Sequence, residues 1–304
     1  MERISCLDGE KYKELKVKEG VYVPDLAVKF PDDDPFRRMV KVEVVRDLKF
    51  DETYPYLDES SDYKRNVFLC DLKTYLCNFL NWMIYGLKVE NKHVLDGKDF
   101  SNGAITVANH QYRWDVPGVR KAVGYRRLWI PAWADTFKTS DYFNLRGARC
   151  IPIPENMGGI KKFNEAFDIL HERKEWFHIF PEGVRWDFYK PFKPFRKGAF
   201  NWAYKYDMPI IPMVYVHRER TGWRKLFAKG EPLMTLKVLE PMYADKSLPR
   251  KAAVDKLRKE VYEKTLPPAL RGYYTDDFDV TREGDALRKM RSLALINIDE
   301  FNRM

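Results

Sequence analysis

The feature that most constrains this chain is a short apolar segment that ends directly in polar, reactive side chains. Residues 104–108 read AITVA, and a β-branched run of this length predicts a buried strand. Asn109 and His110 follow at its carboxyl end, and Asp115 comes after four further residues. In α/β proteins, ligands bind where strands end and helices begin. The segment therefore predicts an α/β fold with a site at this edge of the sheet.

His110 and Asp115 have the residue types of a general base and its orienting partner. A carboxylate beside an imidazole fixes the tautomer and favours the charged ring, so the second ring nitrogen can take a proton from a hydroxyl. Pro117 suits the first turn of a helix that Asp115 would cap. The pair by itself is a weak signal, because a surface histidine beside a helix-capping aspartate has the same spacing. Both interpretations stay open on these residues alone.

A second motif follows about seventy residues later, where the apolar stretch WFHI leads into FPEGVR at 180–185. Together with NHQYRWD at 109–115, it resembles the paired motifs of the glycerolipid acyltransferase family, which includes the 1-acylglycerol-3-phosphate acyltransferases and tafazzin. Further segments resemble the family's other blocks in the same order: RGARCIPIP at 146–154, PFRKGAF at 194–200 and MPIIPMVY at 208–215. The resemblance covers roughly residues 66–270.

The resemblance implies an α/β fold with a mixed, mostly parallel central sheet flanked by helices. It implies transfer of a fatty acyl chain from acyl-CoA or acyl-carrier protein to the hydroxyl of a lysophospholipid, with 1-acylglycerol-3-phosphate as the first expected acceptor and phosphatidic acid as the product. His110 would be the general base and Asp115 its partner, and the hydroxyl would attack the thioester directly. We expect no metal and no cofactor, because the acyl thioester is a co-substrate.

The resemblance also implies a set of substrate-binding residues. Phe180, Pro181, Glu182 and Gly183 would form a turn that faces His110, with Glu182 on the glycerol hydroxyl or next to the phosphate ligands. Gly183 would allow close backbone approach, and backbone N–H groups near 181–183 would stabilise the oxyanion. The residues expected to hold phosphate are Arg185, Arg196 and Lys197.

One position departs from the family pattern and leaves the acceptor open. Many members end the second block in an arginine that holds the acceptor phosphate, and Ile153 occupies that place here. Arg149 is the expected substitute. Two related activities therefore stay open, a CoA-independent phospholipid transacylase of the tafazzin kind and an acyltransferase with an amino-lipid acceptor. An alternative from another class is a non-catalytic, basic membrane-binding module. His178, in the middle of the second apolar stretch, is expected to be a buried structural histidine.

The charge distribution points to an anionic partner. The chain has a formal net charge of +9, and residues 183–230 carry 11 Lys and Arg against 3 Asp and Glu, interleaved with aromatic residues. This pattern suits an anionic lipid surface or a phosphorylated ligand, and its position after the FPEG motif favours these over nucleic acid. We therefore expect a peripheral or monotopic protein at the cytoplasmic face of the cell membrane.

Three regions are expected along the chain. Residues 1–65 form an arm with 13 Lys and Arg against 16 Asp and Glu, which packs on the main domain and includes a possible edge strand at 41–48. Residues 66–270 form the acyltransferase domain, and residues 271–304 form a polar tail with a possible final helix at 286–298.

The domain begins with an apolar helix over residues 66–87. Asp71 and Lys73 interrupt it, which makes it a poor membrane span. Its apolar side chains recur at helical spacing, and this face packs either on the sheet or in one leaflet of a bilayer. They are Phe68, Leu72, Tyr75, Leu76, Phe79, Leu80 and Met83.

Overall fold

A seven-stranded sheet runs through the centre of the protein. The structure is a computed structural model that describes residues 36–39, 42–189, 193, 195–228 and 230–265. The strand order is β1-β7-β6-β2-β5-β3-β4, and every neighbouring pair is parallel except the antiparallel pair β6–β7. The expected α/β fold with a mixed, mostly parallel sheet is confirmed.

The elements lie close to where the apolar patterns predict them. The strands are Lys88–Glu90 (β1), Ile105–Ala108 (β2), Leu128–Trp133 (β3), Cys150–Ile153 (β4), Trp176–Ile179 (β5), Ile210–Arg218 (β6) and Leu233–Val238 (β7). The α-helices are Ser61–Tyr85 (α2), Asp115–Ala122 (α3), Tyr142–Gly147 (α4), Met157–Glu172 (α5), Gly198–Tyr206 (α6) and Arg250–Thr265 (α7). Short 3-10 helices are Lys92–Leu95 (η1), Ala134–Lys138 (η2) and Gly222–Leu226 (η3).

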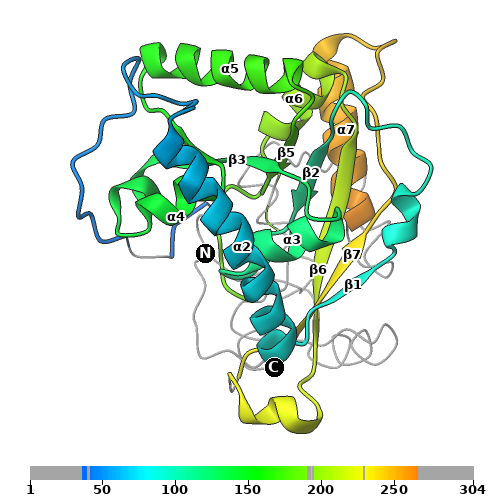
Figure 1. Ribbon diagram of the computed structural model, residues 1–304. Coiled ribbons are helices and arrows are strands. Elements are labelled where there is room, and N and C mark those ends of the chain that lie inside the picture. Colours follow the sequence, from blue (N-terminus) through cyan, green and yellow to red (C-terminus); the bar gives the residue numbers. More distant parts are fainter. Residues whose placement is uncertain (1–35, 40–41, 190–192, 194, 229, 266–304) are drawn as a thin grey trace, which may run out of the picture.

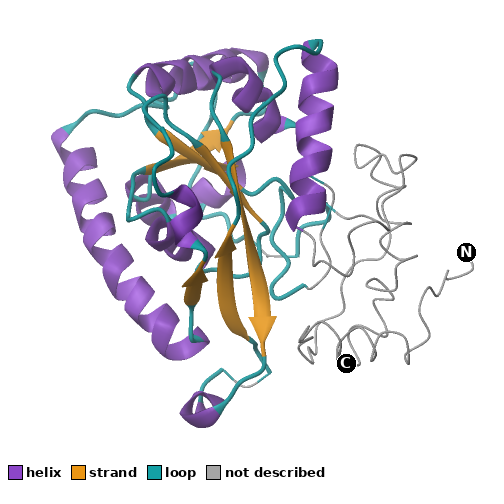
Figure 2. Ribbon diagram, turned by 90° about the vertical axis from the view of Figure 1, so that its right-hand side faces the viewer, coloured by secondary structure: helices purple, strands orange, loops and turns teal. Residues whose placement is uncertain are grey.

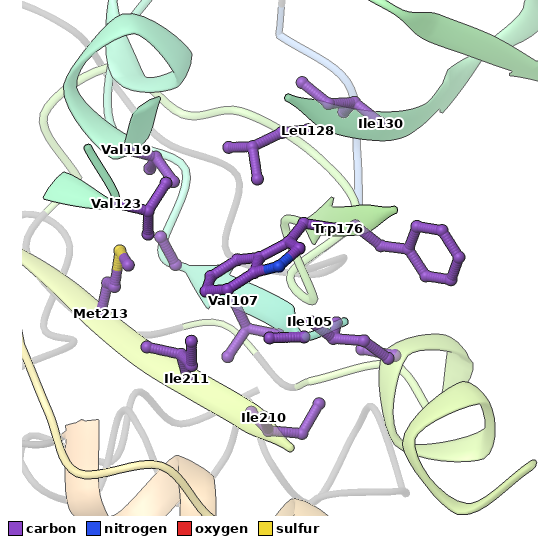
Figure 3. Packing of buried hydrophobic residues seen from close by; sticks show 14 of the residues in the cluster. Ile105, Val107, Val119, Val123, Leu128, Ile130, Trp176, Ile210, Ile211 and Met213 are labelled. Carbon is purple, nitrogen blue, oxygen red and sulfur yellow. The ribbon is translucent and has the colours of Figure 1, made fainter. Parts of the chain in front are cut away.

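Helices cover both faces of the sheet, with α3 and α2 on one side and α5, α6 and α7 on the other (Figures 1 and 2). Strand β2 is central and fully buried, because parallel sheets of this kind are enclosed on both faces. Figure 3 shows Ile105 and Val107 of β2 packed near Trp176 of β5 and Ile211 of β6. Each fully buried side chain of this kind contributes about 1.5–3 kcal/mol. The core therefore holds the carboxyl end of β2 firmly in place.

The arm before α2 packs on the domain without forming a strand. Phe50 and Tyr56 are buried, as expected for a packed extension. The expected edge strand at 41–48 is wrong for the described residues 42–48, which form no ladder. The backbone N–H groups of Val45 and Arg46 both donate to the carbonyl of Lys138, at 2.9 Å each. Lys138 belongs to the 3-10 helix η2, so these bonds are not part of a β-ladder.

Helix α2 begins at Ser61, five residues before the expected start. It turns mainly polar side chains toward the protein and mainly apolar ones toward the outside. Its buried residues are Thr74, Asn78, Asn81 and Tyr85. Five of the seven expected apolar residues are exposed, and Leu80 and Met83 are half-buried. Phe68 is 68% exposed and Leu72 is 62% exposed. The interpretation of this stripe as a core face is therefore wrong, because α2 turns hydrogen-bonding side chains toward the protein. None of the helices in the described part of the chain is long and apolar enough to cross a membrane.

Two regions predicted from the sequence lie partly or wholly outside the described residues. The tail expected at 271–304 lies outside them, as do residues 1–35 of the arm.

Candidate active site

Asn109 joins the end of β2 to the neighbouring strand β6. Its side-chain amide donates to the Tyr215 carbonyl at 3.1 Å, and its amide oxygen accepts the Tyr215 N–H at 2.7 Å. These two bonds link the residue before His110 to β6 beyond the last paired residue, Ala108. This role of Asn109 was not predicted, although an amide side chain directly before the histidine indicates it.

His110 and Asp115 lie together, as predicted from their spacing. The imidazole Nδ1 is 2.7 Å from Asp115 Oδ2, and the carboxylate is fully buried. The same carboxylate accepts the backbone N–H of Gln111 at 2.7 Å and of Tyr112 at 3.1 Å. Because a carboxylate only accepts, Nδ1 carries the ring proton and Nε2 is left as the acceptor.

The expected capping role of Asp115 needs correction. Trp114 occupies the position before the helix, and Asp115 is the first residue of α3. Its carboxylate turns back to the N–H groups of the two residues after His110 instead of forward into the helix. The turn is thereby closed around the carboxylate, which fixes the distance between the imidazole and its partner.

The ring of His110 stacks on Phe180 of the FPEG motif. The two ring centroids are 3.8 Å apart with an interplanar angle of 9°, and the histidine side chain remains 23% exposed. Burial lowers the pKa of His110 well below its usual value, and the charges of Arg185 and Lys193 lower it further. The imidazole is therefore neutral at neutral pH, which is the state a general base needs.

Glu182 anchors the FPEG turn from inside the protein. Its carboxylate forms a fully buried ion pair with Lys193 at 2.8 Å, and it accepts the backbone N–H of His110 at 3.3 Å and of Lys193 at 3.2 Å. The expectation that Glu182 contacts the acceptor is corrected, because no part of its side chain is exposed. Lys193 was counted only as one charge in the basic stretch, and nothing in the local pattern marks it as buried.

Pro181 and Gly183 place Arg196 across the outside of this turn. The backbone N–H of Arg196 donates to the Pro181 carbonyl at 2.7 Å. Gly183 has a φ of +75°, and a Cβ at this position would lie 2.9 Å from Arg196 Nε. Glycine is thus needed both for its conformation and for the side chain that crosses it. The close approach expected at Gly183 is made by Arg196.

The expected oxyanion donors at 181–183 are fewer than predicted. The Gly183 N–H donates to the Phe180 carbonyl at 3.0 Å, which closes the turn. Proline has no N–H, so Pro181 supplies none.

The expected phosphate ligands divide into two groups. Arg185 lies near His110, bonds Asp187 at 2.7 Å and is 25% exposed, and Arg196 is exposed. Arg149 is buried instead and binds Asp71 of α2 through both guanidinium nitrogens, at 2.8 and 2.7 Å. Both terminal nitrogens of Arg149 are thus bonded to the Asp71 carboxylate. The expected phosphate role of Arg149 is therefore corrected to one in holding α2.

Lys197 points away from the candidate site as well. Its ammonium pairs with Asp255 of α7 at 2.9 Å, and it lines a shallow hollow of about 280 Å³ between α6 and α7. The pairing with Asp255 occupies the ammonium in this structure, and the phosphate contact of Lys197 stays a prediction.

Much of the basic stretch serves the end of α2. Arg218 donates to the carbonyl of Gly86 at 2.6 Å, Arg220 to that of Ile84 at 2.9 Å, and Arg224 to that of Trp82 at 3.3 Å. Cations at a helix C-terminus satisfy its last carbonyls and its dipole. Part of the charge excess therefore has a structural purpose. Among the described residues, no group of three or more His, Cys, Asp or Glu is arranged to hold a metal ion.

The polar face of α2 holds the turn that carries Asp115. Asn78 donates to the Pro117 carbonyl at 2.8 Å, and Asn81 donates to the Trp114 carbonyl at 3.2 Å. Asn81 also accepts the Tyr112 hydroxyl at 2.9 Å. Two asparagines of one helix are thus bonded to both flanks of Asp115.

His178 is the buried structural histidine that the sequence predicts. It has no exposed surface, and its Nδ1 lies 2.9 Å from Thr106 Oγ1.

Comparisons with known proteins find similarity to acyltransferases. A family model described as Acyltransferase matches residues 86–216. The 1-acyl-sn-glycerol-3-phosphate acyltransferase of Escherichia coli (strain K12) is 29% identical over 138 residues, which cover 43% of this chain and 53% of that protein. An uncharacterized acyltransferase of Schizosaccharomyces pombe is 27% identical over 172 residues, which cover 52% and 57%.

A solved structure is also similar to this chain. The 1-acyl-sn-glycerophosphate (LPA) acyltransferase PlsC from Thermotoga maritima is 20% identical, with a TM-score of 0.41 and coverage of 68% of this chain and 84% of that chain. This chain spans about half the length of the curated relatives it matches. Residues 86–216 are thus similar to the Acyltransferase family, and the named relatives of this part of the chain are acyltransferases.

Proposed function

We propose that this protein transfers a fatty acyl chain from an acyl thioester to the hydroxyl of a lysophospholipid, with 1-acylglycerol-3-phosphate as the first expected acceptor. The observation that carries the proposal is the 2.7 Å contact between His110 Nδ1 and the buried Asp115, within a domain of the acyltransferase family. Acyl-CoA and acyl-carrier protein are both candidate donors. The names of the relatives support a lysophosphatidic acid acceptor.

The proposed reaction needs one base and no covalent intermediate. His110 Nε2 takes the proton of the acceptor hydroxyl while its oxygen attacks the thioester carbonyl carbon. The tetrahedral intermediate then collapses, the carbon–sulfur bond breaks, and the imidazolium returns the proton to the leaving thiolate. Asp115 stabilises the imidazolium between these two steps through the bond to Nδ1. General-base catalysis of this kind contributes about 10²–10⁴-fold.

The proposed phosphate contacts are Arg185 and Arg196. Arg185 is close enough to His110 for its charge to lower the pKa of the imidazole. Arg196 crosses the outer side of the turn at Gly183. One guanidinium group near the base and a second on the FPEG turn suit an acceptor that carries a phosphate next to its hydroxyl.

The outward face of α2 supports a membrane location. Its exposed residues include Phe68, Leu72, Leu76 and Phe79, each more than half exposed. A soluble protein rarely exposes a contiguous apolar stripe of this size. We propose that this face lies in one leaflet at the cytoplasmic side of the cell membrane, while the polar face of α2 holds the site.

The decisive experiment offers purified protein acyl-CoA or acyl-carrier protein together with lysophosphatidic acid. Free thiol is measured by a thiol reagent, and phosphatidic acid by mass spectrometry. We expect one thiol released for each phosphatidic acid formed. His110→Ala should lower the rate by about 10²–10⁴-fold and leave vesicle binding unchanged. The matched control is His93→Ala, at an exposed histidine of η1.

Other outcomes would identify the alternatives. Chain exchange between two phospholipids without thiol release would support the transacylase, which the exposed Ile153 at the expected arginine position keeps open. Acylation of an amino-lipid in preference to lysophosphatidic acid would point to the other acceptor. An activity that survives His110→Ala would overturn the proposed mechanism. Vesicle binding by a wild-type protein that transfers no acyl chain would favour a non-catalytic, basic membrane-binding module.

A further inference from the structure

We infer that the tip of the β6–β7 connection, residues 222–227, is a second lipid-contacting element that enters an anionic bilayer beside the end of α2. The inference rests on the proposed function, because it extends the membrane-facing surface proposed for α2. It concerns a part of the chain that lies beyond residues 86–216, where the acyltransferase model matches.

Three large apolar side chains gather at this tip without any role in the core. Leu226 is 80% exposed, Trp223 is 47% exposed and Phe227 is 37% exposed. No residue of η3 is buried. Single exposed apolar residues are ordinary, but three within five positions at the end of a hairpin form a patch that needs a partner.

The tip continues the exposed stripe of α2. Along that stripe, the rings of Phe79 and Trp82 lie 5.9 Å apart. The guanidinium carbon of Arg224 lies 5.4 Å from the Trp82 ring centre and 4.5 Å from that of Trp223, so it connects helix and tip. Trp223 in turn contacts Phe227 edge to face at 5.6 Å. Figure 1 shows η3 next to the C-terminal end of α2, so the two elements form one surface.

Arg224 also fixes the tip in position. It donates to the Trp82 carbonyl at 3.3 Å, and Gly86 leaves the space for it, since a Cβ there would lie 3.1 Å from Arg224 Nε. Arg220 reinforces the link by donating to the carbonyls of Ile84 and Arg224, at 2.9 and 3.0 Å. A tip that is already ordered loses little conformational freedom when it enters a membrane.

The charges beside the patch select a lipid surface as the partner. Lys225 is exposed next to Leu226, and Arg224 lies between the tryptophans. Lysine and arginine are attracted to anionic headgroups, and tryptophan prefers the boundary between headgroups and acyl chains. An apolar tip with basic and tryptophan residues at its base fits an anionic leaflet.

The test compares two triple variants in vesicle sedimentation. The tip variant combines Trp223→Ser, Leu226→Ser and Phe227→Ser, which removes the three apolar side chains. The vesicles contain phosphatidylcholine with phosphatidylglycerol. The matched control replaces three exposed residues away from η3 with serine: Met157, Ile169 and Tyr243. We expect partitioning to fall more than about tenfold for the tip variant and to stay unchanged for the control.

A second measurement tests depth of insertion. Brominated acyl chains should quench part of the tryptophan fluorescence of the wild-type protein, and Trp223→Phe should lower the quenched fraction, with Trp82 of α2 giving the remainder. Unchanged melting curves of both variants would show that the fold is intact.

The outcomes separate this inference from the proposed function. If serine at Phe68, Leu72 and Phe79 abolishes vesicle binding while the tip variant binds like wild type, the tip has no lipid contact and the membrane role of α2 stands. If wild type is a dimer that the tip variant converts to a monomer, with vesicle binding unaltered, the patch serves a second copy of the chain. Either result overturns the inference.

Discussion

The turn around His110 buries charged side chains, whereas the outer face of α2 exposes apolar ones. Around His110, the charged side chains of Asp115, Glu182 and Lys193 are fully buried. On α2, side chains such as Phe68 are exposed while Asn81 is buried. Asp115 binds the imidazole of His110 and Glu182 binds its backbone N–H, whereas Phe68, Leu72 and Phe79 leave more than half of their surface exposed. The buried charged groups serve to position the base, whereas the exposed apolar side chains serve contact with a surface outside the protein.

The largest expected effect lies at the buried carboxylate. Asp115→Asn keeps the shape of the side chain but removes the charge that stabilises the imidazolium, so kcat/KM should fall by about 10²–10⁴-fold. Steady-state kinetics with the preferred lysolipid measures this. The matched control is Asp168→Asn, a partly exposed aspartate on α5 that pairs with Lys205. A rate for Asp115→Asn within threefold of wild type, roughly RT ln 3 or less than 1 kcal/mol, would remove Asp115 from the mechanism.

The second expected effect tests the buried ion pair. Lys193→Met leaves the carboxylate of Glu182 buried without its ammonium, so the free energy of unfolding should fall by about 3–5 kcal/mol. Urea unfolding measures the change. The variant that also carries Glu182→Leu should be less destabilised, since it leaves no unpaired charge. Lys205→Met, which breaks a partly exposed pair, should change stability by less than about 1 kcal/mol.

The third expected effect compares the two sides of α2 directly. Asn81→Leu removes the bonds to the Trp114 carbonyl and the Tyr112 hydroxyl, and should destabilise the protein by about 1–3 kcal/mol. Leu76→Asn, on the outer face, should change stability by less than about 0.5 kcal/mol. Thermal and urea unfolding measure both variants. Equal losses at the two positions would contradict the inverted orientation of α2.

The smallest effect, taken for each pH unit, concerns His178. Burial lowers its pKa to about 3, below the unfolded value of 6.5. Between these values the unfolded chain binds the extra proton, so stability falls as pH falls, by up to about 1.4 kcal/mol per unit. Above 6.5 both states are neutral and His178 contributes no slope. His178→Leu should flatten the pH dependence of urea unfolding below 6.5, whereas His93→Leu should not.

The apolar patterns predicted much of the fold because local order and burial coincide in a parallel sheet. The stretch at 104–108 forms β2, and the WFHI stretch before the FPEG motif forms β5. The pairing of His110 with Asp115 was also predicted, since a single turn sets their distance. The edge strand at 41–48 failed, because a strand needs a partner edge that the pattern does not reveal.

The partners of the charged residues could not be predicted from local patterns. Arg149 meets Asp71 across 78 residues, and Glu182 meets a lysine that lies among other basic residues. Periodicity shows that α2 has an apolar stripe, but it does not say which side of the helix faces the protein.

The sequence by itself determined the order of the strands and helices, the His110–Asp115 turn and the resemblance of residues 86–216 to acyltransferases. Only the tertiary structure decided that α2 turns its asparagines inward, that Glu182 is closed off by Lys193, and that arginines of the basic stretch bind the end of α2. The physical reason is range. Backbone periodicity and short turns are set by neighbours in the chain, whereas burial and ion pairing depend on which distant segments the fold brings into contact.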